Sequence, residues 1–62
     1  MWNFWLIVKN TRTNCSVSEN FKTEADALAE AEVQAFDEDM LVTVETGQGK
    51  IIRQFNVELL DQ

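Results

Sequence analysis

Residues 1–8 read MWNFWLIV, and this stretch decides the fold because seven of its eight side chains are apolar. Alternate side chains of a strand point to opposite faces. A strand over residues 2–9 therefore has one wholly apolar face, made by Trp2, Phe4, Leu6 and Val8. Trp5 and Ile7 also give the second face an apolar centre, between polar ends. The stretch predicts a strand in the middle of a sheet, with apolar contacts on both faces.

The rest of the chain divides into three further strands and one helix. The alternating residues 15–21, 40–45 and 51–59 predict strands. Polar residues 10–14 and the glycine-containing residues 46–50 predict the turns of two hairpins.

A helix is predicted between the two hairpins. Thr23 is a good N-cap, Asp26 follows three residues later as in a capping box, and alanines favour helix over residues 24–36. One apolar face recurs at helical spacing and is expected to cover the sheet: Ala25, Leu28, Ala29, Val33 and Phe36. The other face is expected in solvent and holds Glu24, Ala27, Glu30, Ala31, Gln34 and Asp37.

These elements predict one α+β domain over residues 1–62, a small ββαββ unit with a four-stranded antiparallel sheet and one helix packed on one face. The apolar first strand belongs in the middle, which gives the strand order 2-1-3-4. A chain this short is marginal alone and usually needs a disulfide, a metal or a partner. Cys15 is the only cysteine and histidine is absent, so neither an internal disulfide nor a zinc site is expected. Self-association remains as the added source of stability.

The sheet face away from the helix is the predicted interaction site. Its apolar centre consists of Trp5, Ile7, Leu41 and Ile52, and polar side chains surround this centre. An apolar centre inside a polar rim is typical of protein interfaces, and tryptophan is frequent among their anchors. The sequence therefore predicts a homodimer formed through this face.

Patterns that carry chemistry are scarce. No histidine is available to activate a nucleophile, and Cys15 shares a strand face with Val17 and Phe21, which predicts a buried, unreactive thiol. Residues 37–39, Asp-Glu-Asp, lack the alternating ligands and the glycine of a calcium loop. The prediction is a non-enzymatic protein with no catalytic residue, no cofactor and no metal.

Charge selects among the alternative functions. A net charge of −6 repels phosphates, so nucleic acid is a disfavoured partner. A sheet that binds single-stranded nucleic acid by stacking its bases on Trp5 is therefore only the third hypothesis. The second hypothesis rests on an acidic patch formed by Asp26, Glu30, Asp37, Glu38 and Asp39. Such a patch can imitate DNA phosphates, as in an acidic, phage-encoded inhibitor that blocks a basic protein surface.

The leading prediction is a small acidic protein–protein interaction module of the cytoplasm. A single cysteine fits a reducing compartment, and no secretory signal is recognisable. Residues 4–8 are far shorter than the roughly 20 residues that a membrane-spanning helix needs.

Overall fold

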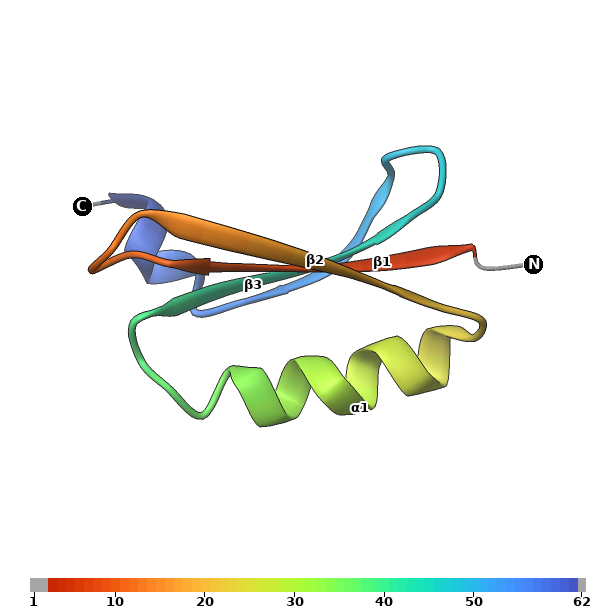
Figure 1. The fold of residues 1–62 in the computed structure, drawn as a ribbon, viewed down its shortest axis with the longest axis horizontal. Helices are drawn as coiled ribbons and strands as arrows, with labels where there is room; N and C mark the ends of the chain where they lie inside the picture. The colour runs from red at the N-terminus through yellow and green to blue at the C-terminus, as the bar shows by residue number, and fades with distance from the viewer. Residues whose placement is uncertain (1–2, 62) are drawn as a thin grey trace.

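The computed structural model describes residues 3–61, which form a four-stranded antiparallel sheet with one helix on one face (Figure 1). The elements along the chain are β1 (Phe4–Asn10), β2 (Cys15–Phe21), α1 (Glu24–Gln34), β3 (Met40–Thr46), β4 (Ile51–Phe55) and the 3-10 helix η1 (Val57–Asp61). The strand order is β2-β1-β3-β4. The predicted ββαββ fold and strand order are confirmed. Trp2, predicted on the core face of the first strand, lies outside the described residues.

Residues with positive φ close the turn of each hairpin. Asn14 has φ 63° and its N–H donates to the carbonyl oxygen of Asn10 at 2.7 Å. Gly49 has φ 89° and its N–H donates to the carbonyl oxygen of Thr46 at 2.9 Å. This region of φ favours glycine and asparagine, so both turns follow from residues that the sequence places there.

The core lies between the two middle strands and the helix. In the register of β1 with β3, Leu6 is opposite Val44 and Val8 is opposite Val42, and all four side chains are buried. Alternation along β1 and β3 then turns the intervening residues to the other face of the sheet.

The side of α1 that covers the sheet is only in part the predicted one. Ala27 and Ala31 are 0% exposed, whereas Val33 and Phe36 are 59% and 87% exposed. The strands already supply the large side chains of the core, so small alanines let the helix backbone lie close to the sheet. Only residues 22–23 separate β2 from α1, and this short connection fixes the rotation in which the helix begins. Val33 of α1 and Phe36, which follows the end of the helix, therefore face solvent, whereas Leu28 packs against the core as predicted.

Asn56 ends the last strand earlier than predicted. It has φ 59°, and its side-chain Nδ2 donates to the carbonyl oxygens of Ala35 at 3.2 Å, Asp37 at 3.2 Å and Met40 at 2.9 Å. Residues 57–61, predicted to be strand as far as residue 59, form η1, which contacts β3. One side-chain amide thus joins the end of α1 and the loop before β3 to the end of β4.

Candidate functional site

The sheet face away from α1 presents an apolar strip along the two middle strands. Trp5, Ile7 and Leu41 form this strip, and each is partly buried. Three cross-strand rows define the face: Asn20–Trp5–Glu45, Ser18–Ile7–Thr43 and Ser16–Lys9–Leu41. Leu41 lies one row from Ile7, and Ile7 one row from Trp5, so the three apolar side chains are neighbours. α1 covers only the opposite face (Figure 1).

β4 contributes Ile51 to this face, in the place where Ile52 was expected. Val44 pairs with Arg53 and Glu45 with Ile51, so β4 has one extra residue at this point. The extra residue, Ile52, packs against the buried core cluster. Ile51 lies opposite Glu45, on the face away from the helix, and is 53% exposed. The predicted strand face of Ile52 was wrong because a bulge changes the alternation of side chains along a strand.

The open face has charges of opposite sign at its two ends. Lys9 stands in the row of Leu41, and Glu45 stands in the row of Trp5, four residues away or about 13 Å along the strand. Within residues 3–61 neither charge forms an ion pair. The face therefore consists of an apolar centre between a positive end and a negative end.

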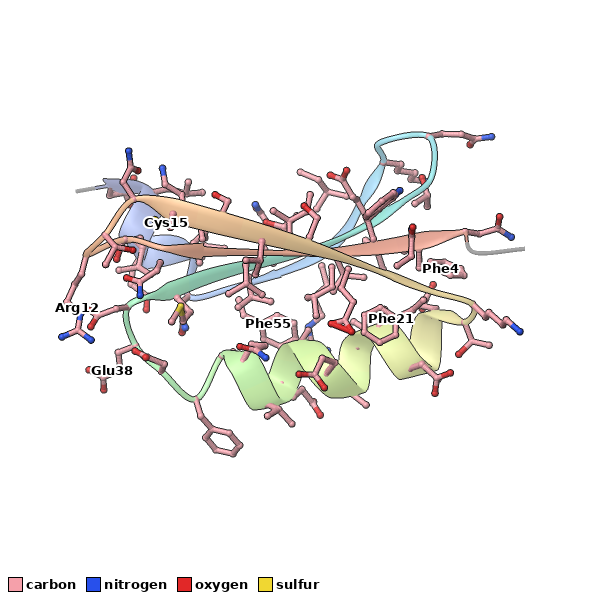
Figure 2. The ribbon with its side chains drawn as sticks, in the orientation of Figure 1. Phe4, Arg12, Cys15, Phe21, Glu38 and Phe55 are labelled. Carbon is pink, nitrogen blue, oxygen red and sulfur yellow. The ribbon has the colours of Figure 1, made fainter. Side chains whose placement is uncertain are left out.

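A second apolar surface lies beside the outer side of α1. Phe55 forms its sheet side, because Phe55 pairs with the buried Val42 and points toward the helix (Figure 2). The guanidinium carbon of Arg53 lies 4.9 Å from the centroid of the Phe55 ring. The result is a groove of about 490 Å³, lined by Ala29, Glu32, Val33, Ala35, Phe36 and Phe55.

Sequence reasoning missed this groove because it assigned Val33 and Phe36 to the core. Ala27 and Ala31, one helical turn apart, were the signal that could have found it. Two small side chains on one helical row favour a close approach of helix and sheet, and that approach leaves the larger residues outside.

The predicted acidic patch is divided into a helical part and a loop part. Asp26 and Glu30 lie one turn apart on α1. Gln34, a further turn along, donates from Nε2 to Glu30 Oε2 at 2.9 Å. Asp26 is exposed and Glu30 is partly buried. This row differs from the row of Ala29 and Val33 that lines the groove.

The loop part of the patch is internally bonded. Asp37 and Glu38 are exposed, and Asp37 Oδ1 accepts a hydrogen bond from the Asp39 N–H at 2.9 Å. Asp39 Oδ2 lies 2.8 Å from Arg12 Nε, and the carbonyl oxygen of Asp39 accepts bonds from Thr11. Asp39 therefore links the β1–β2 turn to this loop. The negative charge that the loop exposes to solvent comes from Asp37 and Glu38.

Cys15 is exposed, contrary to the prediction of a buried thiol. It stands at the start of the edge strand β2, where Val17 is 68% exposed as well, while Phe21 at the other end packs on the core. An edge strand needs only part of its length under the helix, so shared alternation does not ensure burial. In residues 3–61 no three His, Cys, Asp or Glu side chains are grouped to hold a metal ion.

No protein-family model matches the sequence, and no curated protein or solved structure resembles it at a significant level. In the part of the chain that the structure describes, no helix is long and apolar enough to cross a membrane. The open sheet face and the groove beside α1 are the two surfaces of the described residues that are suited to binding.

Proposed function

We propose that the protein is a small acidic, non-enzymatic protein–protein interaction module that forms a homodimer through its open sheet face. One observation supports this above the others: Trp5, Ile7 and Leu41 form a continuous apolar strip on the face that α1 leaves open. Apolar strips inside polar rims are typical of interaction sites. Covering the strip in a dimer adds the apolar burial that a chain of 62 residues needs.

The charges of the open face favour one arrangement of the dimer. In a two-fold dimer the same patch meets itself. A two-fold axis that crosses the strands at the level of Ile7 reverses the strand direction in the second copy. Lys9 of one copy then faces the end that holds Trp5 and Glu45 of the other. Opposite charges meet at both ends, and the apolar strips meet in the centre.

Particle mass tests the homodimer directly. We expect light scattering after size exclusion to give twice the mass of one chain for the native protein and the mass of one chain for Trp5→Glu. A glutamate at this position places an unpaired charge in the contact, which costs at least about tenfold in affinity. Val17→Glu is the matched control, because Val17 is exposed on the helix side of β2 and should leave the mass unchanged. A monomeric native protein, or a dimeric Trp5→Glu variant with an unchanged circular dichroism spectrum, would contradict the proposal.

Charge exchange tests the orientation of the two copies. Lys9→Glu and Glu45→Lys should each weaken the dimer, because each variant brings like charges together at both ends. The double variant should recover dimerisation, since it restores opposite charges across the contact. Additive weakening in the double variant would show that the two-fold axis lies elsewhere.

Binding of single-stranded nucleic acid is the alternative that Trp5 favours, because an exposed indole can stack on a base. Within residues 3–61, however, Lys9 is the only cation whose strand position faces the open side. The homodimer proposal expects no gel shift with single-stranded oligonucleotides. The exposed Cys15, without a partner cysteine in the sequence, fits the reducing cytoplasm as the compartment of this dimer.

A further inference from the structure

The groove beside α1 leaves large apolar side chains in water. Phe36 is 87% exposed and Val33 is 59% exposed, while Phe55 closes the groove from the sheet side. A groove of about 490 Å³ falls in the size range of sites that hold a side chain or a small ligand. The dimer proposed above does not cover this groove, because the two surfaces lie on opposite faces of the sheet (Figure 2).

The groove and the loop that follows it carry more negative than positive charge. Glu32 lines the groove itself, and Asp37 and Glu38 follow Phe36 directly in the chain. In the described part of the chain none of these three carboxylates forms an ion pair. Arg53 is the cation on the sheet side, and its guanidinium stacks on the Phe55 ring. The open carboxylates therefore favour a positively charged occupant.

This distribution of charge also excludes a second copy as the best occupant. A two-fold contact through the groove would set three carboxylates of each copy, Glu32, Asp37 and Glu38, against one cation of the other copy, Arg53. Charges of like sign repel within the screening length of about 8 Å at physiological salt. The open sheet face differs, because it holds Lys9 and Glu45 at separate ends and can pair with itself.

We infer that the groove between α1 and Phe55 binds a basic segment of a different protein, with an apolar side chain in the groove and lysine or arginine beside Glu32, Asp37 and Glu38. The apolar side chain covers Val33 and Phe36. The cations pair with the carboxylates of the rim. This inference does not depend on the sheet-face dimer, and the two sites can be tested separately.

The first experiment uses the full chain and three short synthetic peptides. The first peptide alternates phenylalanine with lysine, the second has glutamate in place of lysine, and the third has serine in place of phenylalanine. In amide NMR titrations we expect the first peptide to shift Glu32, Val33, Phe36 and Phe55. The other two should bind at least about tenfold more weakly, because the second lacks the cations and the third lacks the apolar side chains. Added salt should weaken binding of the first peptide steeply.

Variants of the protein locate the site. The double variant Val33→Ser/Phe36→Ser should bind the first peptide at least about tenfold more weakly, since it removes the two most exposed apolar anchors. Val17→Ser is the matched control, because Val17 is an exposed valine on β2, and it should bind as the native protein does. Glu32→Lys should weaken binding and reduce its salt dependence without removing an apolar contact. Trp5→Glu should bind the peptide with native affinity even when it fails to dimerise.

Several outcomes would overturn the inference. No binding of any peptide, or equal binding of the serine peptide, would show that the groove has no apolar recognition. Equal binding of the glutamate peptide would show that the carboxylates around the groove do not contribute to binding. A fall in particle mass for Val33→Ser/Phe36→Ser would identify a second copy as the occupant. Binding lost in Trp5→Glu but retained in Val33→Ser/Phe36→Ser would place the peptide on the sheet face.

Discussion

The two sides of α1 contrast in a way that hydrophobicity alone does not explain. The side on the sheet carries Ala27 and Ala31, which are 0% exposed. The outer side carries Val33, and Phe36 follows the end of the helix; both of these side chains are mostly exposed. In a close-packed interior the available space decides which side chain fits. β1 and β3 fill the centre of the core with leucine and valine, so the helix places its alanines there and adds Leu28 as a partly buried side chain. Shape therefore selected the alanine row as the buried side of α1 and left Val33 and Phe36 exposed to solvent.

The strongest test of this contrast is to enlarge one alanine on each side of α1. Ala31→Leu should lower the free energy of unfolding by about 3 kcal/mol, because the added atoms have no space between helix and sheet. Ala29→Leu is the matched control on the outer side and should change it by less than about 0.5 kcal/mol. Urea unfolding followed by tryptophan fluorescence measures both values. Equal losses for the two variants would show that the two sides of α1 are packed alike.

The next test concerns the amide that joins the end of α1 to β4. Asn56→Gly keeps a residue that tolerates positive φ but removes the donor to Ala35, Asp37 and Met40, and should cost about 2 kcal/mol. Asn14→Gly is the matched control, since Asn14 also has positive φ and its side chain makes no such tertiary bonds in the described residues. Both values come from the same urea experiment. Similar effects for the two variants would mean that the amide contributes little and that φ alone matters.

The fold was predictable because its determinants are local. Residues 4–8 specify a middle strand through their apolar content, Asn14 and Gly49 specify turns through φ, and Thr23 begins the helix by capping. Each of these depends on a few neighbouring residues. The sequence therefore contains the element order, and the central position of β1 follows from its apolar residues on both faces.

The surfaces were predicted only in part, because they depend on packing between distant segments. The positions of Trp5, Ile7 and Leu41 follow from alternation along β1 and β3. The bulge that places Ile51, and not Ile52, on the open face does not follow from this alternation. It arises in the pairing with another strand, between Val44 and Glu45. The exposure of Cys15 and the rotation of α1 also depend on which strand the helix covers. No periodicity within one segment contains that information.

A smaller effect is expected where α1 begins. Thr23 Oγ1 accepts a hydrogen bond from the Asp26 N–H at 3.2 Å, so Thr23→Ala should cost about 1 kcal/mol. Thr13→Ala is the control, because the Thr13 hydroxyl accepts only a long bond of 3.4 Å from the Cys15 N–H in an exposed turn. Thermal unfolding by circular dichroism compares the two variants. A cost at Thr23 no larger than at Thr13 would mean that the cap adds little to the stability of the helix.

The smallest effect is expected just beyond the end of α1, where Phe36→Ser should change the free energy of unfolding by less than about 0.5 kcal/mol. An 87% exposed ring has few contacts to lose, and serine removes an apolar surface from water. Phe55→Ser is the comparison, because Phe55 packs against the core cluster and should cost several times more. A loss above about 1 kcal/mol for Phe36→Ser would show that the ring closes over Phe55 in solution. The groove would then be filled by the protein's own side chain, and the contrast between the two sides of α1 would be one of degree.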